Sequence, residues 1–167
     1  PQGPIEDFAE ALEQAQGKES KGELKLMIRR GEKTEKVTLK VGTRYGRFAK
    51  TWPADCKKSE RILSELCRFL VEEQRGDGSW GHVVPNTFAP LALLATGGQE
   101  YRKAVTKAAR FHAKTTHDRD EGSLINWRYM AAAIVLSEYY LATRAEWAKK
   151  ELQEIRDFIL WTQYVGL

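Results

Sequence analysis

The side chains best suited to chemistry lie in the second half of the chain, but their spacing does not favour a catalytic site. His112 and His117 are five residues apart, which misses the i, i+4 spacing that places two metal ligands on one helical face. The acidic cluster Asp118–Glu121 would need a deep apolar cavity around it to act as an acid. Cys56 and Cys67 have neither the number nor the spacing of a disulfide framework or a zinc site. We therefore expect no metal, no cofactor and no catalytic residue in this chain.

Two of these residues have a plain structural interpretation. His112 falls on an apolar stripe beside Phe111, which favours a core histidine with satisfied hydrogen bonds over a metal ligand. Cys67 lies in a helical apolar stripe and is expected in the core. The sequence also contains no phosphate-cradling glycine-rich loop and no nucleophile elbow.

The composition is that of a soluble globular protein, since 42% of the 167 residues are hydrophobic and 30% are charged. The longest apolar run, Met130–Leu136, is far shorter than the roughly 20 residues of a membrane-spanning helix, so we expect no membrane span. The net charge of +4 is uneven, because residues 21–50 hold ten Lys and Arg against three acids. A basic excess of this kind could attract nucleic acid.

The same basic region alternates between apolar and polar residues, as half-buried strands do. Strands are predicted over Leu24–Arg29 and Lys36–Val41, and Arg30–Thr34 supplies a hairpin turn between them. No aromatic side chains interleave with the basic ones for base stacking. A solvated basic strand face is therefore favoured over a nucleic-acid site.

A helix predicted over Glu6–Gln16 precedes this hairpin. The order resembles the C-terminal half of a PDZ domain of the bacterial envelope-protease type, matched by Ile5–Leu12, Leu24–Arg30 and Lys36–Val41. In that family the peptide groove lies between this helix and an earlier strand, and no such strand is present here. The resemblance implies that the chain as given does not bind C-terminal peptides.

From about residue 55 onward the apolar residues recur with helical periodicity. The segment 127–142 is apolar nearly all round, which predicts a buried helix. Pro90 is expected in the first turn of its helix, where proline is tolerated. The predicted helices are Glu60–Gln74, Asn86–Thr96, Gln99–Lys114, Trp127–Ala142 and Ala145–Tyr164.

Two segments of this helical region recur at fixed offsets. Arg75–Trp80 aligns with Arg119–Leu124 at an offset of 44, and Phe69–Gln74 aligns with Phe158–Gln163 at an offset of 89. Helical hairpins of this length stack because each one cannot bury its apolar face alone, and such arrays usually hold at least three units. The chain holds roughly two and a half units, so we expect it to be a part of a longer array.

The most specific motif is Gln74–Gly81, in which an amide ends a helix, glycines permit a sharp reversal and an indole provides a large apolar plate. It resembles the Gln-Trp repeat of squalene and hopene cyclases, which prenyltransferase β-subunits and other α/α-toroids share in looser form. In those enzymes the motif staples helices and does not contact substrate. A structural role is therefore expected for Gln74, Gly76, Gly78, Trp80 and Gly81.

Two further resemblances concern the same half of the chain. Asp118–Glu121 superficially matches the Asp-x-Asp-Asp acid motif of class II cyclases, but the offset of 44 places it in a stapling loop. Trp80–His82 and Glu138–Thr143 resemble a bacterial family in which a PDZ domain precedes a cyclase-like helical toroid, although Arg144 departs from the turn residues expected there. The family resemblance implies a periplasmic or secreted protein.

The cavity face of the predicted toroid is a candidate ligand site. In a toroid the N-terminal ends of the inner helices face a central cavity, and aromatic and polar side chains there suit a peptide or a glycan. Trp127 and Tyr129 have packing as their alternative role. The candidate cavity residues are His82, Asn86, Trp127, Arg128 and Tyr129.

The sequence thus predicts a mainly α protein, with helical-hairpin repeats of a partial α/α-toroid over residues 55–167, a linker over 44–54 and a small half-PDZ-like α+β segment over 1–43. The predicted function is a non-catalytic binding or scaffold protein of the bacterial cell envelope with a protein or peptide partner. The alternative is an enzyme that uses the toroid cavity, cyclase-like or lyase-like, with its acids outside this chain. Nucleic-acid binding through the basic hairpin is a third hypothesis.

Overall fold

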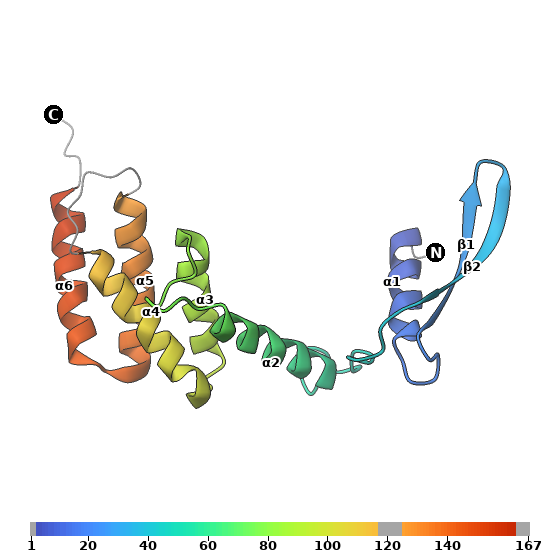
Figure 1. Cartoon of the computed structure of the whole chain (residues 1–167), viewed down its shortest axis with the longest axis horizontal. Helices are drawn as coiled ribbons and strands as arrows, with labels where there is room; N and C mark the ends of the chain where they lie inside the picture. The colour runs from blue at the N-terminus through green and yellow to red at the C-terminus, as the bar shows by residue number, and fades with distance from the viewer. Residues whose placement is uncertain (1–2, 117–124, 163–167) are drawn as a thin grey trace. The chain divides into compact units, whose positions relative to one another are not determined.

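The computed structural model describes residues 3–116 and 125–162 (Figure 1). These residues form six α-helices, one short 3₁₀ helix and one antiparallel pair of strands, so the prediction of a mainly helical chain that begins with a small α+β segment is confirmed. The chain divides into two compact units, Pro1–Leu66 and Cys67–Leu167. The boundary between them falls inside helix α2, Lys57–Glu72.

The first unit consists of a helix and a hairpin. Helix α1 (Pro4–Ala15) packs beside strand β1 (Glu23–Arg30), which pairs with strand β2 (Lys33–Lys40) (Figure 1). A proline opens α1, where its missing N–H costs nothing. Gly31, with a φ of +61°, supplies the left-handed residue of the hairpin turn.

The pairing of the two strands separates apolar from basic side chains. Leu24 lies opposite Leu39, and Leu26 lies opposite Val37, so the apolar residues share one face of the hairpin. The other face carries exposed basic side chains at positions 25, 29, 36 and 40. The predicted strand pair with a solvated basic face is therefore confirmed, but only β1 is half-buried, because every residue of β2 except Val37 is exposed.

A buried lysine in the first turn of α2 bonds to side chains of α1 and of the residue that follows it. Lys58 is only 6% exposed. Its Nζ donates to Glu13 Oε2 at 2.7 Å and to Gln16 Oε1 at 2.6 Å, and it lies 4.1 Å from the centre of the Phe48 ring. The backbone N–H of Phe48 also donates to the carboxylate of Glu13. These partners offset the cost of burying the ammonium group.

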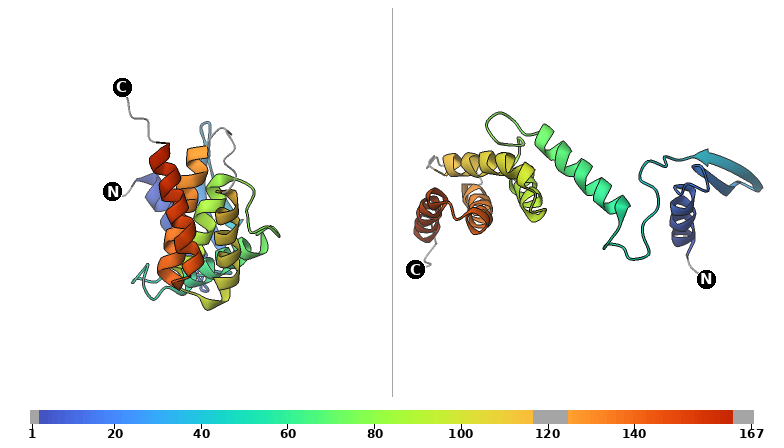
Figure 2. Two further views of the ribbon diagram at one scale, coloured as in Figure 1. Left: turned by 90° about the vertical axis from the view of Figure 1, so that its left-hand side faces the viewer. Right: turned by 90° about the horizontal axis from the view of Figure 1, so that it is seen from below.

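The second unit is a two-layer arrangement of helices that follow the end of α2. Helices α3 (Val83–Ala95) and α5 (Ile125–Thr143) contact each other, α4 (Arg102–Thr115) crosses one side of both, and α6 (Glu146–Trp161) packs against α5 (Figure 2, right). The short 3₁₀ helix Gln99–Tyr101 leads into α4, within the segment predicted to be one helix.

Helix α3 begins earlier than predicted, and this corrects the position of Pro90. The ring of His82 accepts a hydrogen bond from Val84 N and so caps the helix, while Pro85 occupies the first turn, where no N–H partner is needed. The helix therefore starts at Val83, and Pro90 lies in its interior.

Helix α5 is buried on one face only, which corrects the prediction that it is a buried helix. Ala132, Val135 and Leu136 are fully buried at 0% exposure, because α3, α4 and α6 pack on that side. Ile134 and Leu141, on the opposite face, are 48% and 56% exposed. The all-round apolar pattern thus correctly predicted the core contact, but no element among the described residues covers the remaining face.

Candidate functional site

The loop Gln74–Gly81 connects α2 to the rest of the second unit through side-chain hydrogen bonds to backbone carbonyls. The Trp80 indole donates to Leu70 O at 2.8 Å, one of the last carbonyls of α2, which have no partner within the helix. The Gln74 amide donates to Ala104 O at 2.8 Å, at the start of α4, and to Gly78 O at 3.1 Å. This geometry agrees with the stapling role that the motif suggests.

Glycine is required at the tightest point of this loop. Gly78 has a φ of +96°, and a Cβ atom there would collide with the backbone carbonyl of Lys107 on α4. Gly81, with a φ of +87°, lies against the movable guanidinium of Arg75, and Gly76 has open space around it. The close approach of backbone to backbone at Gly78 therefore fixes the loop on α4.

Pro90 leaves a backbone carbonyl of α3 without its helical partner, and His112 bonds to that carbonyl. Because proline has no N–H, the carbonyl of Asn86, four residues earlier, loses its helical partner. The Nε2 atom of His112 lies 2.9 Å from that carbonyl and donates to it. His112 is 3% exposed, and burial lowers its pKa below the ordinary value of 6.5, so the ring is neutral. His112 is thus a satisfied core histidine, as predicted.

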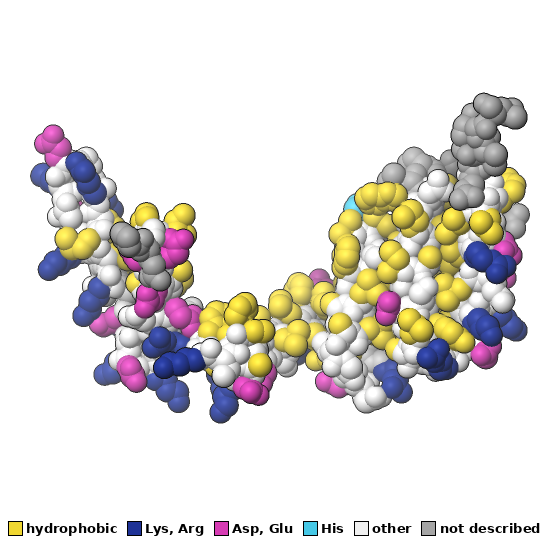
Figure 3. Space-filling view, turned by 180° about the vertical axis from the view of Figure 1, so that it is seen from behind, with side chains coloured by type: hydrophobic (Ala, Val, Ile, Leu, Met, Phe, Trp, Pro, Cys, Tyr) yellow, Lys and Arg dark blue, Asp and Glu magenta, His cyan; other side chains and the backbone are white. Residues whose placement is uncertain are grey.

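An apolar surface covers the side of α3 and α5 that faces away from α4, and we call it the open face (Figure 3). On α3 its two members are four residues apart, and on α5 its members follow at spacings of three, four and seven residues. Their exposed fractions range from 46% to 63%, far above those of the core. The open face consists of Val84, Phe88, Trp127, Met130, Ile134 and Leu141.

A groove runs along the open face between the two helices. It has a volume of about 540 Å³, and α3 contributes Leu91, Leu94 and Ala95 to its wall. Helix α5 contributes mainly apolar residues, with Glu138 as the one ionisable side chain that lines the groove. The surface can therefore desolvate apolar groups over two helices while offering one carboxylate.

The structure separates the five candidate cavity residues. Trp127 is 56% exposed on the open face, and the exposed ring of His82 caps its own helix. Asn86 is buried, where its Oδ1 accepts from Trp80 N at 2.5 Å. Tyr129 is 2% exposed and stacks on Phe158 with ring centres 3.7 Å apart, which is the packing role. Arg128 is half-buried.

The sequence interpretation missed most of the open face. Phe88, Met130 and Ile134 were assigned to helices but not to a surface. Two signals could have identified it: α3 contains no charged residue at all, and α5 carries more large apolar residues than a single buried face needs.

Several sequence interpretations fall outside the described residues. His117, the acidic cluster Asp118–Glu121 and the repeated loop Arg119–Leu124 are among them, as is the end of the third repeat copy at Gln163. Cys67 is described, and its 2% exposure in the core of the second unit confirms the prediction for it.

Residues 3–116 and 125–162 contain no group of three or more His, Cys, Asp or Glu side chains placed to hold a metal ion. None of the helices described has the length and apolar character that crossing a bilayer requires.

The fold and the open face define a mainly helical protein with an exposed apolar surface on two of its helices. Residues 59–165, more than half of the chain, match the family model described as a domain of unknown function, DUF6288, and the chain belongs to that family. The match covers α3 to α6 and most of α2. Comparisons with curated proteins and with solved structures gave no match.

Proposed function

We propose that this chain is a non-catalytic binding scaffold whose open face holds an apolar segment of a protein or peptide partner. The observation that carries the proposal is the open face itself. Six large apolar side chains lie exposed on two adjacent helices, and two of them, Ile134 and Leu141, line a groove of about 540 Å³. Soluble proteins rarely expose contiguous apolar surface of this kind unless it contacts a ligand or a partner.

The arrangement of the helices supports the further proposal that the second unit is part of an α/α-toroid built from helical hairpins. Helices α3 and α5 pack side by side, and α4, which lies between them in the chain, packs on their outer side. Stacked hairpins have this pattern, since each buries its apolar face against its neighbours. In such an array the open face would line the concave side.

The order of the elements in the first unit, a helix followed by a two-stranded hairpin, supports the proposal that this unit contains a half-PDZ-like segment. Its α1 and β1 border a groove of about 570 Å³ lined by Ala11, Gln14, Leu24 and other residues of the two elements and of the turn between them. The proposed location in the bacterial cell envelope, periplasmic or secreted, rests on the family resemblance of the sequence.

The chemistry of the open face favours a peptide over a glycan. Phe88 and Trp127, which are 63% and 56% exposed, could stack on either kind of ligand. A glycan also needs several polar partners, whereas Glu138 is the one ionisable side chain in the groove. A partner with aliphatic or aromatic anchors is therefore the better match.

An enzymatic use of the same cavity would need several acids to converge there. Glu138 is the only acid among the residues that line the groove, so this requirement is not met there. The binding role is therefore the one that the described residues support, and the enzyme remains the alternative.

The experiment is a selection of displayed peptides on the full chain, with a variant of the open face as counter-selection. Phe88→Asp together with Ile134→Asp places two charges on exposed positions and should not disturb the core. Lys149→Asp, on the exposed surface of α6, changes the net charge by the same amount and serves as the matched control. We expect peptides with apolar and aromatic anchors that bind the wild type and the control but not the double variant.

Each outcome of the selection bears on the proposal. Peptides that bind the double variant as well as the wild type would place the binding surface elsewhere. Failure to enrich any peptide, with retention on a panel of polysaccharides instead, would replace the peptide with a glycan. Turnover of a bound compound that Glu138→Gln abolishes would favour the enzyme.

A further inference from the structure

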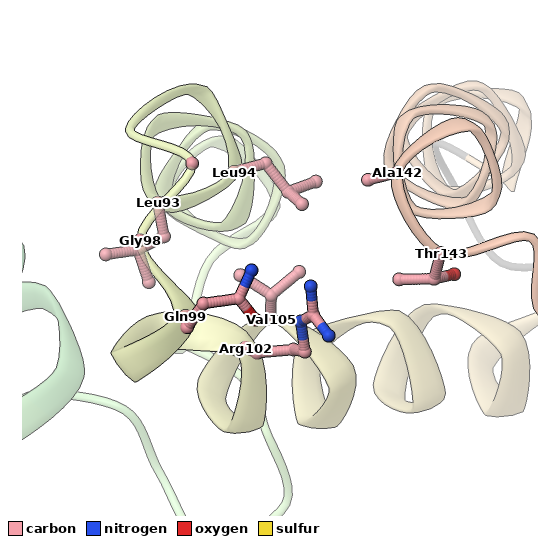
Figure 4. Close-up of a pocket in the computed structure, with 9 residues that line it drawn as sticks. Leu93, Leu94, Gly98, Gln99, Arg102, Val105, Ala142 and Thr143 are labelled. Carbon is pink, nitrogen blue, oxygen red and sulfur yellow. The ribbon is translucent and has the colours of Figure 1, made fainter.

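A second cavity lies at one end of the α3 and α5 pair, next to the start of α4 (Figure 4). Its volume is about 180 Å³, well above the ~10–15 Å³ that holds a single water. Its walls are apolar and come from three helices. They include Leu93, Leu94, Val105 and Ala142.

Two exposed polar side chains border this cavity, one from the 3₁₀ helix and one from the first residue of α4. Figure 4 shows Gln99 and Arg102 directed into the space between α3 and α5. Arg102 is the one charged residue in the lining, and it forms no ion pair with any residue that the structure describes. Glu100, the nearest acid along the chain, does not line the cavity.

Several carbonyls at the helix ends around Arg102 already have other partners. On α3, Leu93 O accepts from the Thr96 hydroxyl at 2.7 Å and Leu94 O from Gly97 N at 3.0 Å. On α5, Tyr140 O accepts from Arg144 N at 2.7 Å. These carbonyls therefore do not depend on the guanidinium of Arg102.

We infer that this cavity binds the carboxylate of a small aliphatic acid. The fork of guanidinium donors on Arg102 would hold the carboxylate, with the Gln99 amide as a further donor, because planar bidentate pairing is what arginine provides. The aliphatic part of the ligand would replace water against Leu94, which is half-buried, and Ala142, which is exposed. The ligand is either a free acid or the C-terminal residue of a peptide, since both present this chemistry.

The inference does not depend on the proposed function. The cavity shares Leu94 and Ala142 with the groove of the open face, but its polar groups belong to the 3₁₀ helix and the start of α4. A failure to bind acids would leave peptide binding on the open face untouched, and the reverse holds equally.

The test is a titration of the full ¹⁵N-labelled chain with hexanoate, hexanamide, N-acetyl-leucine and N-acetyl-leucinamide. Each acid should bind, with shifts at residues 97–105 and 142–143, and its neutral amide should bind about tenfold more weakly or not at all. The stronger of the two acids identifies the source, a free acid for hexanoate and a chain terminus for N-acetyl-leucine.

Three variants make the test specific. Arg102→Gln should weaken the binding of both acids about tenfold or more. Lys103→Gln removes the same charge from the next position, outside the lining, and should leave the affinity within about twofold. Ala142→Leu, at an exposed position, should fill the cavity and block both acids without unfolding the chain.

Three results would overturn the inference. They are equal binding of an acid and its amide, retention of acid binding by Arg102→Gln, and the absence of saturable binding of either acid to the wild type.

Discussion

The two sides of the α3 and α5 pair have similar apolar character but different surroundings. On the covered side, Ala132 and Leu136 are 0% exposed, and the buried ring of His112 on α4 is bonded to a backbone carbonyl. On the open face, Phe88 and Met130 are 63% and 56% exposed. Apolar residues alone therefore do not define a core, because burial also requires a packed neighbour.

The covered side of α5 combines small and large residues. Ala131, Ala132 and Val135 let the backbones of neighbouring helices come close, and Leu136 fills the core between them. The open face has the large residues Trp127 and Met130, which have no packed neighbour of this kind.

The largest contrast is expected between two neighbouring residues of α5. Leu136→Ala on the covered side removes a fully buried side chain and should lower the free energy of unfolding by about 2–5 kcal/mol. Ile134→Ala on the open face should change it by no more than about 0.5 kcal/mol. Urea denaturation of both variants measures the difference. Equal losses would mean that the open face is part of the core.

The second contrast is between two glycines. Gly78→Ala should lower the free energy of unfolding by about 3 kcal/mol, because the new methyl group collides with Lys107 O and the φ of +96° is strained. Gly97→Ala, at a φ of +69° but in open space, should cost only about 1 kcal/mol. Comparable losses would show that contact of the loop with α4 does not matter.

The third prediction is a double-mutant cycle on the covered side. His112→Phe leaves Asn86 O without a donor and should cost about 1–3 kcal/mol in unfolding free energy. In a Pro90→Ala background, the restored N–H at position 90 supplies that donor, so the same substitution should cost about 1 kcal/mol less. Additive costs would refute the shared hydrogen bond.

The smallest effect concerns pH. Burial lowers the pKa of His112 in the folded state below its ordinary value of 6.5, so the unfolded chain binds a proton more readily. The free energy of unfolding should therefore fall as the pH drops below about 6.5. His112→Gln, which keeps a donor but does not titrate, should flatten this part of the curve. A wild-type curve unchanged by His112→Gln would argue against a neutral buried ring.

Periodicity predicted the helices and the hairpin because it depends on which residues face an apolar environment. The strand pair over residues 23–40 and the helices α4 and α6 follow directly from it. The start of α3 could not be predicted in this way, because the cap comes from His82, a residue that rarely caps helices. The interior position of Pro90 follows from that early start.

Burial and partners were harder to predict than element type. Nothing local distinguishes Tyr129, which stacks on Phe158, from Trp127, which lies exposed two residues earlier. The bond from His112 to Asn86 O joins residues 26 positions apart. In contrast, the contacts of Gln74 and Trp80 agree with a role suggested by the motif, since a loop that reverses sharply must satisfy the helix ends it joins.

The most direct test of the central claim uses ¹⁹F NMR of the chain labelled with 5-fluorotryptophan, titrated with a peptide from the selection described above. Trp127 lies on the open face, while Trp80 and Trp147 are half-buried on the covered side, and Trp127→Phe assigns the signal. We predict that the Trp127 resonance shifts saturably and that those of Trp80 and Trp147 stay in place. A saturable shift of Trp80 or Trp147 with no change at Trp127 would contradict a binding role for the open face.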